Sequence, residues 1–410
     1  MAVRCGRGDA ASADALKAQD GPHQTCLHHA HARSVARPFR CFETGQTSDK
    51  VPVACCTADH VMGLVPLLCT ICDGAMSSQF AAGPSNAPPP LLEIYGPYRL
   101  RSFVRQTLSH VYVTLDRPYA VHELRLPSEA NERTPGEPLE NEHTGRDIQF
   151  DSEVQGWKNV LGEQAKEAYT VSAGPIAHRV PCIGYVVREQ PRPLQLDAKA
   201  AMAMLDRNTE ALREANGAKF NPRSLLSKLT RERRPIKLPN GEQLLPPAME
   251  SDDAPRTVTI LGDTSDALGL GGFVASESRS ADMVVHESTN AFLPLLDASQ
   301  ASLTRAEVEE KARDHGHSTP EVAARFAHHV GARGSLVLNH LSARYPAPAL
   351  ALNSAKRTKE QDVIDAIRDA ALAEWRALQG SDDVGDVLVA HDFFEVEVPR
   401  YDKRRKASSV

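Results

Sequence analysis

Apolar and polar positions divide the chain into a first stretch without a regular pattern and a longer body with one. Residues 1–50 mix glycine, alanine, serine, histidine and cysteine, and show no sustained helical or strand period. From Asp59 onward the pattern becomes regular, beginning with helical spacing over 59–71. The pattern then predicts a buried strand over 91–97 that ends in a Gly-Pro turn, a helix over 98–110, strands around 111–115 and 119–124, and an acidic polar loop over 127–145.

The second half of the chain alternates predicted strands and helices. Strands over 169–175 and 182–189 flank a turn that carries His178, and an Ala-, Leu- and Glu-rich stretch over 198–217 predicts a helix. Strands that each deliver a metal-capable side chain at their carboxyl end are typical of a layered α/β hydrolase. Three such strands are predicted, namely 256–263 ending at Asp263, 281–287 ending at Glu287 and 334–340 ending at His340, with a helix over 319–332 before the last.

Length and composition narrow the class of protein. The 410 residues correspond to two or three domains, or to one large enzyme domain with insertions. A hydrophobic fraction of 41% can supply a sizeable core, which excludes a chain that is disordered throughout. No run of about 18 apolar residues and no signal-peptide core occur. We therefore expect a soluble protein of the cytoplasm or nucleus without a membrane partner, and mitochondrial import stays open.

The cysteines are distributed unevenly. Seven of the eight lie in the first 72 residues, and only Cys182 follows. They include a single CxxC pair, with no second pair at zinc-finger spacing. In a reducing compartment such cysteines need not form disulfides. The skew therefore sets the N-terminal stretch apart without defining a metal module.

One set of polar residues could hold metal ions. Asp59, His60, His178, Asp263 and His340 each flank an apolar strand or the start of a helix. Three imidazoles and two carboxylates suit a pair of divalent metals, because imidazole favours zinc and a carboxylate can bridge. Two metals would lower the pKa of a shared water and stabilise a phosphoryl displacement. Any one of these histidines alone is more often a core or capping residue, so the argument depends on the joint pattern.

The residue pattern resembles the short form of tRNase Z, an endoribonuclease of the metallo-β-lactamase superfamily. The resemblance extends from about residue 59 to about residue 399, and it implies an α/β fold, the metallo-β-lactamase αβ/βα four-layer sandwich with an inserted arm. The matching text includes DHVMGLVPLLCTI (59–71), LEIYGPYRLRSFV (92–104), PIAHRVPCIGYVVREQ (175–190), VTILGDTSD (258–266), ADMVVHESTN (281–290), HGHSTPEVAARFA (315–327), VLNHLSARY (337–345) and VAHDFFEVEVP (389–399).

The resemblance also implies roles for individual residues. His317 matches the residue that protonates the leaving 3′ oxygen, with Glu287 orienting it, while His315 is interpreted as structural. Asp59 would be both a ligand of the second zinc and the general base. Two zinc ions per subunit are implied, and their expected ligands in this chain are Asp59, His60, His178, Asp263 and His340.

One departure from the family pattern concerns the first zinc. The HxHxDH motif of the family would place histidines at positions 55 and 57, where this chain has Cys55 and Thr57. A cysteine thiolate can bind zinc, whereas threonine is a poor ligand. Two interpretations follow: a diverged first-zinc site, or residues 1–58 joined incorrectly to an intact body. We therefore expect residues 1–58 to be unmatched and poorly ordered, a hydrolase domain over 59–400 and a basic tail over 401–410.

An inserted segment over 198–240 lies where the resembling family has an arm that holds tRNA. Its basic residues can contact phosphates, which position RNA without reading its sequence; a solvated helix face is the competing interpretation. The resemblance implies removal of 3′ trailers from precursor tRNA by a homodimer. The alternatives are another phosphodiesterase of this superfamily and a catalytically impaired tRNA-binding subunit. The candidate RNA-binding residues are Arg223, Lys228, Arg231, Arg233, Arg234 and Lys237.

Overall fold

Two β-sheets form the body of the protein. The computed structural model describes residues 2–4, 50–72, 91–162, 168–249, 255–269, 272–345, 359–391 and 394–399. The larger sheet contains β7 (Tyr169–Ile176), β8 (Cys182–Glu189), β11 (Thr257–Ile260), β12 (Met283–Glu287), β13 (Ser335–Asn339) and β14 (Val387–Val389). The smaller one contains β2 (Lys50–Pro52), β3 (Leu92–Pro97), β4 (Tyr119–Arg125), β5 (Glu142–His143) and β6 (Asp147–Gln149), and β1 (Ala2–Arg4) pairs separately with β15 (Glu395–Glu397).

The larger sheet has the strand order β14-β13-β12-β11-β8-β7. Strands β11 to β14 are parallel, and β8 joins them antiparallel, with Val258 opposite Val187. Their valine-rich sequences suit strands that are buried on both faces. Because β11, β12 and β13 are parallel neighbours, the residues that follow them meet at one edge of the sheet. The three strands predicted to deliver metal-capable side chains therefore do so side by side.

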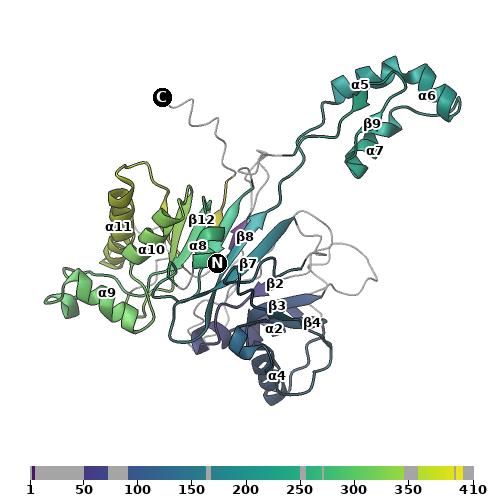
Figure 1. Ribbon diagram of the computed structural model, residues 1–410. Helices are drawn as coiled ribbons and strands as arrows, with labels where there is room; N and C mark the ends of the chain where they lie inside the picture. Colours follow the sequence, from purple (N-terminus) through teal and green to yellow (C-terminus); the bar gives the residue numbers. More distant parts are fainter. Residues whose placement is uncertain are drawn as a thin grey trace, which may run out of the picture. The chain divides into compact units, whose positions relative to one another are not determined.

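Helices cover the outer faces of the two sheets, which gives four layers (Figure 1). Alongside the larger sheet lie α8 (Gly272–Glu277), α10 (Pro320–His329) and α11 (Lys359–Gln379), whose Phe326 and Trp375 are buried in the core. Alongside the smaller sheet lie α2 (Leu64–Cys72) and α4 (Leu100–His110). Between the sheets, Leu124 of β4 packs with Tyr185 of β8. The predicted αβ/βα layering is therefore confirmed, with α1 (Ala58–Val61), η1 (Pro127–Glu129), η2 (Ala298–Gln300) and α9 (Arg305–Asp314) completing this part.

Residues 50–52, which the sequence pattern placed in the unmatched segment, form strand β2 of the smaller sheet. Strand β2 pairs in parallel with β3, and Val53 donates its N–H to the carbonyl of Tyr95 at 2.7 Å. Val51 of this strand and Val53 just after it are both buried. A three-residue strand is too short to show a period in the sequence, which is why the pattern missed it. Residue 1 and residues 5–49 of the predicted 1–58 segment, and the tail 401–410, lie outside the described residues.

The strand predicted around 111–115 is wrong. Val111 ends α4 as its C-cap, and Tyr112 has a positive φ of 54° and is 96% exposed. Valine and tyrosine favour strands where they pack against a neighbouring surface, and here both side chains are exposed. The local composition was therefore typical of a strand while the surroundings were not. The predicted loop 127–145 also contains the short elements η1 and β5.

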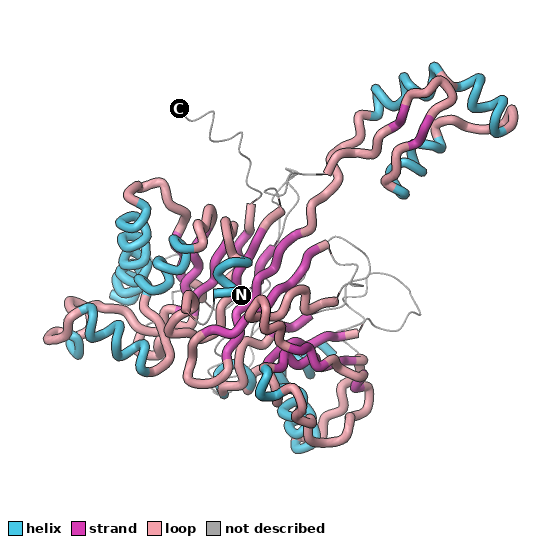
Figure 2. The backbone as a smooth tube through the Cα atoms, in the orientation of Figure 1, coloured by secondary structure: helices cyan, strands magenta, loops and turns pink. Residues whose placement is uncertain are grey.

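The segment Glu189–Arg256 forms a separate compact unit, here called the arm. It contains α5 (Ala198–Arg207), α6 (Thr209–Asn216), α7 (Ser224–Glu232) and the antiparallel pair β9 (Ile236–Lys237) and β10 (Gln243–Leu244) (Figure 2). Leu205, Leu212 and Leu229 are among the leucines of its own core. The single helix predicted over 198–217 is divided at Asn208, whose buried amide donates to the Met204 carbonyl at 2.8 Å.

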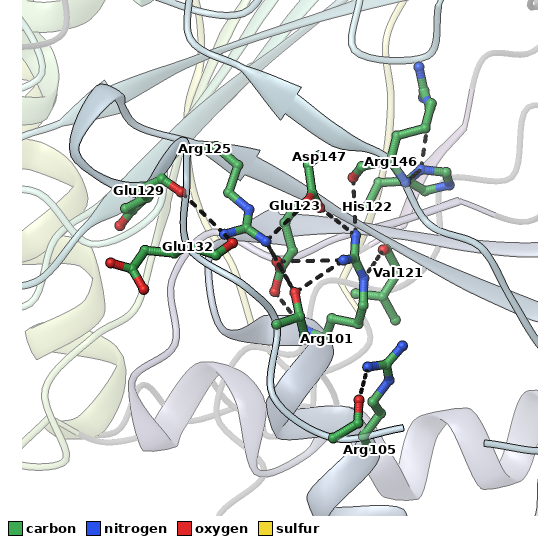
Figure 3. A network of polar contacts seen from close by, with 12 residues as sticks. Arg101, Arg105, Val121, His122, Glu123, Arg125, Glu129, Glu132, Arg146 and Asp147 are labelled. Atoms are coloured by element: carbon green, nitrogen blue, oxygen red, sulfur yellow. Dashed lines mark hydrogen bonds and ion pairs between the residues drawn. The ribbon is translucent and has the colours of Figure 1, made fainter. Parts of the chain in front are cut away.

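A buried ion-pair network fixes the polar segment that follows β4 (Figure 3). Glu123 is fully buried, and its carboxylate lies 2.8 Å from the Arg125 guanidinium and accepts the Arg101 backbone N–H at 3.0 Å. Arg101 also bonds Asp147 at 2.8 Å. The network therefore ties α4, β4 and β6 together.

Among the described helices, none is both long and apolar enough to cross a membrane.

Candidate metal centre

Polar side chains converge where three parallel strands end. Asp263 follows β11, Glu287 is the last residue of β12 and His340 follows β13. Asp263 and Glu287 are almost completely buried. His340 has a positive φ of 54°, an unfavourable conformation for a residue with a side chain. Such backbone strain persists where the surrounding structure imposes it, and it is concentrated at functional sites.

Asp263 is at the centre of these contacts. Its Oδ1 lies 2.9 Å from Nε2 of His60, which α1 carries, and 3.4 Å from Nε2 of His340. The rings of His60 and His340 are 5.6 Å apart between centroids. Three of the five predicted ligands are therefore in contact, although His60 is about 200 residues from Asp263 in the chain.

Two groups of possible ligand atoms share this carboxylate. One consists of Cys55, His60 and Asp263, and the other of Asp263, His317 and His340; within each group the ligand atoms lie within 4.8 Å of one another. Thiolate, imidazole and carboxylate are the zinc ligands of proteins, and a carboxylate has two oxygens with which to bridge. The donor set therefore fits zinc, and the shared Asp263 fits a bridging position.

His317 is held by a carboxylate. Its Nδ1 lies 3.0 Å from Oε1 of Glu287 and 3.3 Å from the hydroxyl of Thr289. The Thr289 hydroxyl donates to Glu287 at 2.5 Å and also lies 2.9 Å from Nδ1 of His340. These contacts hold the His317 ring through its Nδ1. Sequence reasoning missed Thr289, because nothing in the local pattern shows that it bridges residues 28 and 51 positions away.

The remaining predicted ligands are less closely placed. Nδ1 of His178 bonds the carbonyl of Gly316 at 2.7 Å, and its ring centroid is 5.2 Å from that of His317. His178 belongs to neither of the two ligand groups. Asp59 lies in α1 by its backbone, and its side chain is outside the described part of the structure. His315 is exposed and bonds the Lys311 carbonyl at the end of α9.

Cys55 is buried beside a second cysteine. It forms an isolated antiparallel bridge with Cys182, and its Sγ lies 2.9 Å from the Thr57 hydroxyl. A hydrogen bond with Cys182 lowers the pKa of Cys55, and contacts with His60 and Thr57 lower it further. These effects outweigh burial, which raises it, and the pKa falls to about 4. These contacts favour the ionised form of Cys55, while the pKa of Cys182 is raised well above its usual value by that same hydrogen bond and by burial.

His60 has the opposite shift. Burial lowers its pKa, but hydrogen bonds to Asp263 and Cys55, together with their negative charges, outweigh burial and raise it to about 10. Asp263 and Cys55 therefore both favour a proton on His60. A metal ion at this position would take the place of that proton as the compensating positive charge.

The candidate RNA-binding residues lie on the surface of the arm. Arg223 and Arg233 cap the two ends of α7, and all six predicted residues are exposed. Arg231 is 79% exposed at its side chain and lies 3.5 Å from Glu232. Ion pairs that are this exposed contribute little to the stability of the fold, so stability does not explain why six basic residues are clustered here.

Sequence comparison finds named relatives of the chain, although no family model matches it. It is similar to the zinc phosphodiesterase ELAC protein 1 of Bos taurus, with 32% identity over 362 residues covering 83% of this chain and 81% of the relative. It is also similar to the ribonuclease BN of Cronobacter sakazakii, with 29% identity over 300 residues covering 73% and 72%. A solved structure of human tRNase Z, short form, aligns with a TM-score of 0.42 and 24% identity, covering 85% of this chain and 79% of that one.

Proposed function

The chain belongs to the family of zinc phosphodiesterase ELAC protein 1, the short-form tRNase Z of metallo-β-lactamase fold, and on this basis we propose that it is a zinc-dependent endoribonuclease acting on precursor tRNA. It removes the 3′ trailer by hydrolysing the phosphodiester on the 3′ side of the discriminator nucleotide. The observation that carries the proposal is the pair of ligand groups that share Asp263 at the end of β11.

Four side chains are our candidates to hold two zinc ions at this edge of the sheet. They are Asp263, which contacts both neighbouring histidines, together with His60, His340 and His178. Zinc bound there lowers the pKa of a water molecule and neutralises charge on a phosphodiester. We assign Asp59 as a further ligand and as the base for the attacking water from the family resemblance.

His317 is proposed to donate a proton to the departing ribose oxygen. As the general acid His317 is an imidazolium: its Nδ1–H donates to the Glu287 carboxylate 3.0 Å away, which orients the ring, and its Nε2–H faces the substrate and supplies the proton. The Thr289 hydroxyl holds Glu287 in turn at 2.5 Å. A ribose alkoxide is a poor leaving group, and general acid catalysis of this kind contributes about 100- to 10 000-fold in rate.

The arm is proposed to bind the tRNA backbone. Its six exposed basic residues can neutralise phosphates, and this interaction is independent of base sequence. We further propose that the protein is a homodimer in which the arm of one protomer presents tRNA to the centre of the other. The arm has a core of its own, which supports its action as an independent unit.

The first test compares His317→Ala with His315→Ala. Precursor tRNA cleavage should fall about 100- to 10 000-fold in His317→Ala and stay near wild type in His315→Ala, because His315 is exposed outside the cluster. Turnover of bis(p-nitrophenyl) phosphate should persist in His317→Ala, because its leaving group needs no proton.

Two results would contradict this assignment. If His317→Ala loses bound zinc and both activities together, His317 is a metal ligand and not the proton donor, a role its place beside Asp263 and His340 allows. If the wild-type chain binds precursor tRNA without cleaving it under zinc-saturating conditions, the protein is a tRNA-binding subunit and not an enzyme.

A further inference from the structure

Cys55 occupies a rigid position between the two sheets. Its side chain is completely buried, and the Ile183 N–H donates to the Ala54 carbonyl at 2.9 Å. This hydrogen bond flanks the bridge between Cys55 and Cys182, as at a non-hydrogen-bonded pair of an antiparallel ladder. A residue held in this way from β2 on one side and β8 on the other has a fixed side-chain direction.

The sulfur lies close to two other side chains that could bind zinc. Sγ of Cys55, a ring nitrogen of His60 and an oxygen of Asp263 lie within 4.8 Å of one another. With zinc–sulfur and zinc–nitrogen bonds of about 2.3 and 2.0 Å, two ligands of one tetrahedral ion are about 3.5 Å apart. Small side-chain movements therefore suffice to bring all three atoms to one ion.

We propose that Cys55 is a zinc ligand, and that Cys55, His60 and Asp263 together hold one ion with a fourth position open. Three protein ligands and an open position are typical of catalytic zinc. The inference rests on the proposed function only for the identity of the metal. It gives His60 and Asp263 a sulfur partner at the position where the family resemblance would have histidine.

Thr57 takes a different part in this arrangement. It stands at the second histidine position of the family motif, and its hydroxyl lies 2.9 Å from Sγ of Cys55. A hydroxyl at that distance can donate a hydrogen bond to the thiolate and orient it. Cys55 would then bind the ion and Thr57 would orient Cys55, at the two positions where the family motif has histidine ligands.

The test uses cobalt in the purified full-length protein under a reductant that contains no thiol. A thiolate ligand gives Co²⁺ a sulfur-to-metal charge-transfer band in the near ultraviolet. We expect this band in the wild type and in Cys56→Ser, and its loss in Cys55→Ser. Cys56 is the matched control because it is adjacent in the chain and exposed. Zinc affinity, measured by competition with a chelator, should fall at least about 100-fold in Cys55→Ser alone.

Further variants keep the inference falsifiable. Cys182→Ser should retain the band, and Cys55→His should bind zinc tightly with no sulfur band, which excludes misfolding as the cause of a loss in Cys55→Ser. A wild type without the band, or a band that survives in Cys55→Ser, would overturn the assignment. Precursor tRNA cleavage measured in parallel separates the two proposals: cleavage without the band contradicts only the sulfur ligand, and the band without cleavage contradicts only the enzyme.

Discussion

At the scale of single residues, the centre depends on a glycine with no room for a side chain. A Cβ on Gly262 would lie 2.6 Å from Cβ of Ala54 and 2.7 Å from Sγ of Cys182. The Cβ of Ala54 cannot rotate away, because its position is fixed by the backbone. Gly262 therefore sets how closely the end of β11 approaches the segment that carries Cys55.

We expect Gly262→Ala to separate Asp263 from Cys55. Overpacking of this kind costs about 1–3 kcal/mol of unfolding free energy, and the displaced ligands should bind zinc at least about tenfold more weakly. Urea unfolding of the metal-free protein and chelator competition measure the two effects. Gly272→Ala is the control, since a Cβ there meets nothing within 4 Å. Equal stability and zinc affinity in the two variants would refute this account.

The sequence revealed some of these residues and not others, for physical reasons. Asp263 and His340 could be predicted because each follows a short strand of β-branched or aliphatic residues, and parallel strands end at a common edge. Cys182 and Thr289 could not, because their roles arise from interactions with residues distant in the chain. No local period records which side chain will support another after folding.

At the scale of elements, an ion pair fastens β2 to the sheet. Nζ of Lys50 lies 2.9 Å from Glu93 of β3, and Nε2 of His122 lies 3.3 Å from the same carboxylate. Burial raises the pKa of Glu93, but the contact with His122 and the hydrogen bond and charge of Lys50 outweigh it and hold the pKa well below its usual value of 4.5. The ionised carboxylate therefore stabilises the folded state.

This pair predicts a particular dependence of stability on pH. A carboxylate with a lowered pKa contributes stability above its ordinary value of 4.5, and this is lost as the pH falls below that value towards the folded-state pKa. At neutral pH, Glu93→Gln should lower the unfolding free energy by about 1–3 kcal/mol. The difference from wild type should narrow as the solution is acidified below pH 4.5, as measured by urea unfolding at each pH. Glu140→Gln, at an exposed position, should show no such change.

A constant difference between Glu93→Gln and wild type across that range would show that the carboxyl contributes by shape alone. How well each strand could be predicted from the sequence depended on its length. Strand β2 has only three residues, so its place in the sheet depends on partners that the sequence pattern does not mark. Strands β11, β12 and β13 have longer apolar runs, and they could be predicted from the chain itself.

At the scale of the whole molecule, the distribution of charge matters more than its sum. The net charge of -6 suggests no affinity for RNA. Six exposed basic residues nevertheless lie within a fifteen-residue stretch of the arm, from Arg223 to Lys237. A local positive field of this kind attracts a polyanion whatever the net charge.

Neutralising part of this cluster should weaken tRNA binding without touching the centre. In the variant with Arg231, Arg233 and Arg234 changed to Ala, precursor tRNA cleavage should fall while bis(p-nitrophenyl) phosphate turnover stays unchanged. The salt dependence of tRNA affinity should also become shallower, by about 0.7–0.9 in the log–log slope for each phosphate that the arm no longer neutralises. Changing Arg133, Lys158 and Arg279 to Ala removes the same charge from exposed positions outside the arm, and should do neither.

The same arm variant tests whether tRNA is presented from one protomer to the other. It is mixed, after subunit exchange, with Asp263→Ala, which has an intact arm and lacks the shared ligand. If the arm acts in trans, a mixed dimer has one working centre, served by the partner's arm. Random pairing makes half of the dimers mixed, each with one productive centre of two, so activity should recover to about a quarter of wild type. If the arm serves its own protomer, or if sedimentation finds a monomer, the mixture will be no more active than its two components.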